Sequence, residues 1–180
     1  GIVMSIELEM LAWVSGLTVM MWVPYILAHI GNVGLVPALT YQADGTPLPG
    51  WAARAKRAHC NAVENLAPFA ALVIVAHLAE ATNEATASAA IAYFWLRAAH
   101  YAVFTANIPF ARTLTFAGSW LAQVCILYQI LIAYDVGPTD RYQVGSFPKY
   151  RILLRPLSFT LYIAASAHLM SASSFVASVG

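Results

Sequence analysis

The sequence contains few charged residues. Asp, Glu, Lys and Arg make up 9% of its 180 residues, whereas a soluble domain carries about 25%. Hydrophobic residues make up 61%, a share that water alone would not solvate. The formal net charge is +1, which gives no reason to expect nucleic acid as a partner, since that needs Lys and Arg clustered on one face. The composition indicates a protein embedded in membrane lipids, with a length that suits one domain.

Cysteine is nearly absent. Cys60 and Cys125 are the two in the sequence, and neither belongs to a CxxC pair, which excludes a disulfide framework and a Cys-rich zinc site. We therefore predict no metal centre. A basic segment ahead of the first apolar run is also missing, and that run is too long for a signal peptide. We expect no cleavable signal.

Long runs without formal charge predict membrane spans, because a spanning helix needs about 20 predominantly apolar residues. From Met10 to Ala43 there is no Asp, Glu, Lys or Arg, and Pro24 is expected to kink the helix there. The predicted fold is an all-α membrane protein, a four-helix transmembrane bundle within residues 1–135. Its spans are Met10–Ile30, Trp51–Leu78, Ala87–Ala106 and Leu114–Ala133.

Residues 136–180 form a separate C-terminal extension, a loop followed by a hydrophobic segment. Leu157–Val179 has no formal charge but contains six serines. It fits either a fifth span packed through small residues or a helix lying at the interface. The orientation stays open, because basic residues occur both in the first loop, at Arg54, and in the extension, at Arg151.

Two predicted spans carry charged side chains inside the bilayer region. Arg57, Asn61 and Glu64 share one helix face within about 60°. Arg97 and His100 share a face of the third span. A charge at mid-bilayer costs about 2.5–3.5 kcal/mol, so these groups must face protein, water or a ligand. Glu64 is the candidate counter-ion of Arg97. Two roles remain open for this pair, a structural lock between helices or contact with a ligand.

Three segments resemble the MAPEG family, the membrane-associated proteins in eicosanoid and glutathione metabolism. The sequence RAHCNAVENLAPF over residues 57–69 is similar to the family's second-helix signature. Arg97–His100 resembles its third-helix Arg-x-x-His element, and Ile108–Phe116 resembles the start of its fourth helix. The resemblance covers roughly residues 10–135 and keeps the family's order and spacing.

The resemblance implies a homotrimer with glutathione sites between subunits, near the cytosolic face. It implies glutathione as co-substrate and a lipophilic electrophile as the second substrate. Arg112 matches the arginine that stabilises the glutathione thiolate. The glutathione-binding positions match Arg57, Asn61, Glu64 and Arg97, together with His100 beside them.

The sequence also departs from the family pattern. Phe104 stands where the family often has a tyrosine, and residues 136–180 have no counterpart in a four-helix pattern. The expected function is a glutathione-dependent membrane transferase or peroxidase of the bacterial type, located in the inner membrane. The alternative is a non-catalytic subunit of the same fold, which docks onto a larger membrane complex through its extension.

Overall fold

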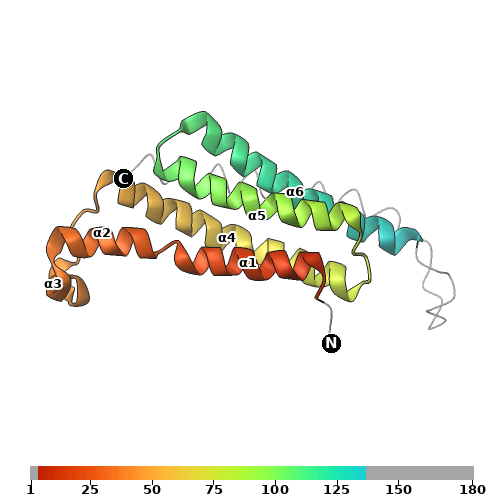
Figure 1. Cartoon of the computed structure of the whole chain (residues 1–180), viewed down its shortest axis with the longest axis horizontal. Coiled ribbons are helices and arrows are strands. Elements are labelled where there is room, and N and C mark those ends of the chain that lie inside the picture. Colours follow the sequence, from red (N-terminus) through yellow and green to blue (C-terminus); the bar gives the residue numbers. More distant parts are fainter. Residues whose placement is uncertain (1–3, 137–180) are drawn as a thin grey trace, which may run out of the picture. The chain divides into compact units, whose positions relative to one another are not determined.

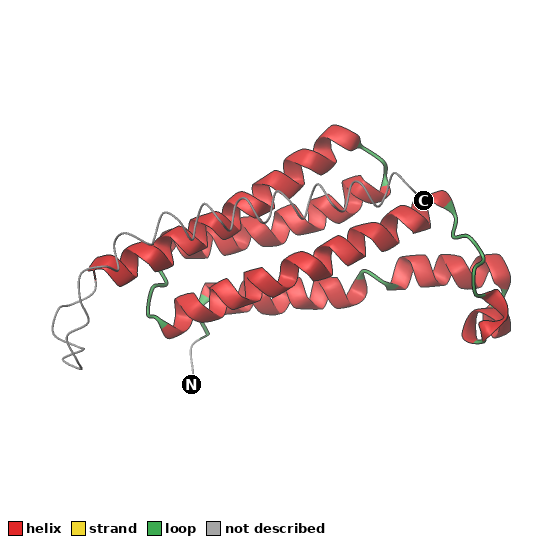
Figure 2. Ribbon diagram, turned by 180° about the vertical axis from the view of Figure 1, so that it is seen from behind, coloured by secondary structure: helices red, strands yellow, loops and turns green. Residues whose placement is uncertain are grey.

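The computed structural model describes residues 4–136, which are helical and contain no strand (Figures 1 and 2). The predicted all-α class is confirmed for these residues. The helix predicted over 157–179 lies outside them, and the division at residue 135 stays a prediction. The elements are α1 (Ile6–Met20), α2 (Val23–Val33), α3 (Leu35–Leu39), the short 3-10 helix η1 (Tyr41–Ala43), α4 (Gly50–Leu78), α5 (Glu84–Thr105) and α6 (Pro109–Val136).

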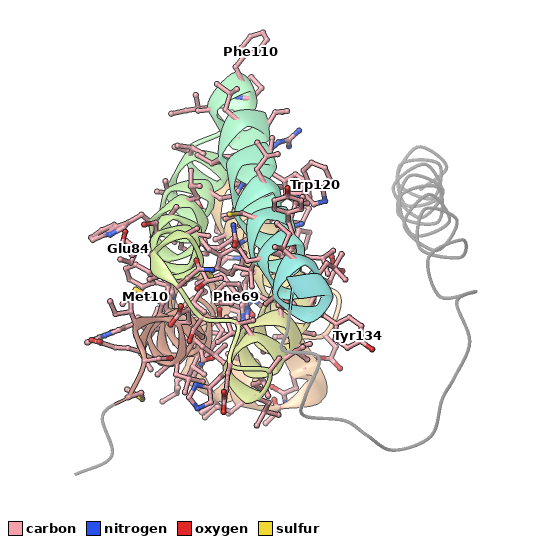
Figure 3. The ribbon with its side chains drawn as sticks, turned by 90° about the vertical axis from the view of Figure 1, so that its right-hand side faces the viewer. Met10, Phe69, Glu84, Phe110, Trp120 and Tyr134 are labelled. Atoms are coloured by element: carbon pink, nitrogen blue, oxygen red, sulfur yellow. The ribbon has the colours of Figure 1, made fainter. Side chains whose placement is uncertain are left out.

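The long helices of the described part form a bundle in which α5 packs against α1, α4 and α6 (Figure 1). The rings of Phe69 on α4 and Tyr93 on α5 stack, with centroids 3.8 Å apart. The Tyr93 hydroxyl donates to the Asn65 carbonyl, 2.9 Å away, one residue from the carbonyl that Pro68 leaves without an N–H partner. Phe69 lies among the helices, whereas Phe110 projects outward from α6 (Figure 3).

The first predicted span is divided into two helices. α1 ends at Met20 and α2 begins at Val23, so that Pro24 lies in the first turn of α2. Proline has no N–H to donate to the carbonyl four residues earlier, and its ring clashes with that carbonyl. Tyr101 on α5 donates to the Met21 carbonyl at this break, over 2.9 Å. Pro24 therefore interrupts the first span, as expected, and the Tyr101 side chain forms a hydrogen bond to the backbone at this interruption.

Two helices begin earlier than the sequence predicts. α5 starts at Glu84, because the Asn83 side chain accepts hydrogen bonds from the first backbone N–H groups. α6 starts at Pro109, five residues before the predicted span over Leu114–Ala133. Proline suits the first helical position, since that N–H has no partner within the helix. Pro109 therefore begins a helix, and Arg112 lies within its first turn.

Three stretches of the described part are long and apolar enough to cross a membrane: Ile6–Val33, Gly50–Leu78 and Pro109–Tyr134. α5 has 22 residues, enough to span by length, but it does not meet the same apolar criterion. It contains Arg97 and His100, both buried inside the bundle. Arg97 and His100 thus face other helices, as the cost of exposing charge to lipid requires.

Candidate functional site

The polar residues of α4 divide between the inside and the outside of the bundle. Buried alanines, including Ala58 and Ala62, form the face of α4 that approaches its neighbours. Asn61 borders this face and is half-buried, whereas Arg57 and Glu64 are exposed in the single chain. The sequence predicted one shared face for Arg57, Asn61 and Glu64. In the structure, the Asn61 amide is directed into the bundle, whereas Arg57 and Glu64 are directed outward.

Arg97 lies almost completely inside the bundle, with 1% of its surface exposed. Its Nη2 donates to Asn61 Oδ1 over 2.8 Å, whereas Nε and Nη1 have no hydrogen-bond partner among residues 4–136. The contact expected with Glu64 is not formed. The reason is geometric, since Glu64 is about 60° further round α4 than Asn61 and is exposed.

This arrangement leaves a buried cation with an incomplete set of partners. A guanidinium presents five N–H donors and no acceptor, and a buried charge is costly unless it is paired and hydrogen-bonded. Asn61 supplies one neutral acceptor to Arg97. Any further partner of Arg97 has to accept hydrogen bonds, and an anion would also offset the charge.

His100 is buried one helical turn after Arg97 and contacts the start of α6. Its Nδ1 lies 3.1 Å from the Arg112 carbonyl and 3.2 Å from Thr115 Oγ1. A carbonyl only accepts, so we assign the proton to Nδ1. Nε2 then carries a lone pair, and it is buried without a partner in the described part of the chain. His100 thus fixes the backbone at Arg112 and retains a free acceptor.

The Arg112 side chain is exposed, but it is not isolated. Its guanidinium carbon lies 4.9 Å from the centroid of the Phe104 ring, within the range of a cation–π contact. The Phe104 ring meets His100 edge to face, with centroids 5.6 Å apart. The residue that replaces the family tyrosine therefore contacts the arginine expected to stabilise the thiolate.

Some contacts around the site could not have been found from residue spacing. Arg54 Nε donates to the Thr105 carbonyl over 2.9 Å, which ties α4 to the carboxyl end of α5. The Tyr25 hydroxyl lies 3.1 Å from His59 Nδ1. The members of these two pairs lie 51 and 34 positions apart in the sequence. Nothing in the sequence around any of the four residues indicates its partner.

A family model describes most of the chain. The MAPEG family model matches residues 10–132, more than half of the 180 residues. The chain belongs to the MAPEG family. No curated protein and no solved structure matches the chain. Every site residue discussed above lies within the matched residues. Together with the three apolar stretches, family membership makes this an integral membrane protein.

One departure from the MAPEG pattern raises the question of whether Tyr101 replaces the hydroxyl that Phe104 lacks. The Tyr101 hydroxyl is directed to the Met21 carbonyl at the break between α1 and α2. Arg112, by contrast, stacks on Phe104. Tyr101 therefore supports the first span and is not a substitute for the missing hydroxyl.

We expect Tyr101→Phe to weaken the protein without changing its site. The substitution removes one hydrogen bond to a backbone carbonyl, which contributes about 1 kcal/mol. Unfolding of the detergent-solubilised protein, followed by far-UV circular dichroism, should show that loss. Any glutathione binding or activity of the wild type should keep its strength and its pH dependence. A shift in the pH dependence would instead place the Tyr101 hydroxyl in the site.

Proposed function

We propose that this MAPEG protein is a glutathione-dependent transferase or peroxidase that acts on lipophilic electrophiles entering from the bilayer. The observation that carries the proposal is Arg97, a buried guanidinium with two nitrogens that lack partners within residues 4–136. Glutathione has two carboxylates, and arginine binds a carboxylate through two parallel hydrogen bonds. Glutathione also has one ammonium group, for which the exposed Glu64 is the matching charge.

The remaining site residues supply the other requirements of this chemistry. Arg57 offers a second cation on the outer face of α4. A free thiol has a pKa of about 8.5, so only a few per cent is thiolate at neutral pH. A neighbouring cation favours the thiolate, and Arg112 is the arginine proposed for that role. The two unpartnered nitrogens of Arg97 are covered in the single chain, so we expect side chains to move when glutathione binds.

The proposed assembly is a homotrimer in which α4 contacts the neighbouring subunits. Exposed residues recur along α4 at alternating intervals of three and four, the spacing of a helix–helix seam. A charge on such a line cannot face acyl chains without large cost, so a second copy of the chain is the proposed cover. The line consists of Arg57, Cys60, Glu64, Ala67, Ala71, Ile74 and Leu78.

Native mass spectrometry in mild detergent tests the assembly. We expect a trimer, and Ala71→Trp should reduce it because the large ring prevents close approach of two helices. Ala92→Trp on α5 is the matched control, since Ala92 is also exposed but lies off this line. Monomers or dimers alone in the wild type would contradict the proposed trimer.

Calorimetric titration with glutathione tests the function. We expect saturable binding to the detergent-solubilised protein and loss of thiol from a mixture of glutathione and a lipophilic electrophile. S-methylglutathione should bind without supporting turnover, because it keeps both carboxylates and has no thiol. Absence of binding would reject the enzyme and favour the alternative, a non-catalytic MAPEG subunit that docks through residues 136–180.

A further inference from the structure

The Arg112 guanidinium on α6 lies over the face of the Phe104 ring on α5. The guanidinium carbon is 4.9 Å from the ring centroid, and no hydrogen bond or ion pair joins this guanidinium to residues 4–136. An exposed arginine otherwise samples many rotamers, at an entropic cost when it is ordered. The ring is therefore the contact that selects where the charge of Arg112 lies.

The Phe104 ring is in turn positioned by its contact with His100. Phe104 lies one turn after His100 on α5, and the two rings meet at 75° with centroids 5.6 Å apart. His100 Nδ1 in turn donates to the carbonyl of Arg112. The two α5 residues thus fix both ends of Arg112, its backbone by a hydrogen bond and its side chain by the ring face.

This contact leaves the hydrogen-bonding capacity of the guanidinium unused. The guanidinium has five N–H donors, and none of them has an acceptor among residues 4–136. These donors can therefore bind an anion while the guanidinium carbon lies over the Phe104 ring.

We propose that Phe104 is a positioning residue, which holds the Arg112 guanidinium toward the thiolate of bound glutathione. This inference rests on the proposed function. The thiol is deprotonated and its proton passes to solvent, while Arg112 stabilises the resulting negative charge through its N–H edge. Phe104 touches neither thiol nor electrophile. It acts through Arg112, so that the ring replaces the missing tyrosine hydroxyl by a different physical means.

Arg112 reactivity tests the ring contact without glutathione. Phenylglyoxal modifies accessible guanidinium groups, and the adduct on the peptide containing Arg112 can be followed by mass spectrometry. Phe104→Leu should speed this modification roughly two- to fivefold, the factor expected for an exposed cation–π contact. Phe104→Tyr keeps the ring face and should react like the wild type. The rate at Arg57, exposed on α4, should be the same in all three proteins.

The titration of bound glutathione tests the role in thiolate formation. In Phe104→Leu, the midpoint of thiolate absorbance near 240 nm should move to higher pH by roughly 0.4–0.7 units, and Phe104→Tyr, which keeps the ring face, should not show this rise. Phe104→Met serves as a second apolar variant if Phe104→Leu does not fold. Unchanged reactivity of Arg112 or an unchanged midpoint in the folded variant would overturn the positioning role. If the wild type binds glutathione, such a result leaves the proposed function standing; if it binds none, both fail.

Discussion

Arg112→Ala should lower turnover at neutral pH by roughly 10²–10³-fold, the cost of losing one contact that stabilises charge in a transition state. The loss should shrink as the pH rises. Under the proposed function, Arg112 lowers the thiol pKa of bound glutathione, so that thiolate would already be abundant at neutral pH. Without Arg112, this pKa returns toward about 8.5, and hydroxide then produces the thiolate that the cation no longer favours.

Arg57→Ala is the matched control for Arg112→Ala. Both side chains are exposed arginines near the same end of the bundle, but Arg57 is proposed to hold a carboxylate that stays ionised over the whole pH range. Its removal should weaken glutathione binding equally at every pH. Thiolate absorbance near 240 nm, measured against pH in both variants, separates the two roles. Identical thiol titrations in Arg112→Ala and the wild type would leave the catalytic proposal without its central residue.

Arg97→Met should separate ligand binding from stability. Within the described part of the chain, the wild-type guanidinium is buried with one hydrogen bond and two unpartnered nitrogens. Replacing a buried, poorly paired charge with an apolar side chain of similar size is often neutral or stabilising, by about 1–4 kcal/mol. We expect the ligand-free protein to unfold at the same or a higher denaturant concentration. Glutathione affinity should fall at least about 30-fold, since losing a partner of a buried charge costs about 2–5 kcal/mol.

The opposite pattern would identify Arg97 as a structural lock. In that case Arg97→Met would lower the free energy of unfolding and leave glutathione binding unchanged. Asn61→Leu is the companion variant, because it removes the single acceptor now bound to Arg97. It should destabilise the ligand-free protein by leaving the guanidinium with no partner among residues 4–136. Calorimetry and denaturation of the same preparations measure both effects.

The helices of the bundle were predicted best where loop residues mark both ends. α4 spans Gly50–Leu78, against a predicted Trp51–Leu78, because the Pro- and Gly-rich stretch over residues 44–50 precedes it and the polar link over residues 80–86 follows it. The helix starts were harder, since they depend on single residues. Asn83 begins α5 three residues before the predicted start, and Pro109 begins a helix that the sequence placed after it. A proline disfavours continuation of a helix that precedes it, but it suits the first position of a helix that follows.

The candidate site residues were chosen from the sequence, but their contacts could not be. Charge complementarity favoured Glu64 as the partner of Arg97, whereas the structure places Asn61 there. The helical wheel gives angles about one helix axis and does not say which angle faces α5. That choice depends on the buried alanines of α4, such as Ala58 and Ala62, which set the close-packed face. The contact between Arg112 and Phe104 likewise joins α6 to α5, so the spacing of residues along one helix could not predict it.

The burial of Arg97 and His100 inside α5 also bears on how the chain enters the membrane. α5 falls outside the stretches apolar enough to cross by themselves, yet it packs between α1, α4 and α6 in the finished bundle. Its carboxyl end is joined to α6 by the short turn over residues 106–108. We therefore expect the insertion machinery to release α5 only together with α6, as a helical hairpin, so that a chain truncated after Thr105 would fail to integrate its last helix.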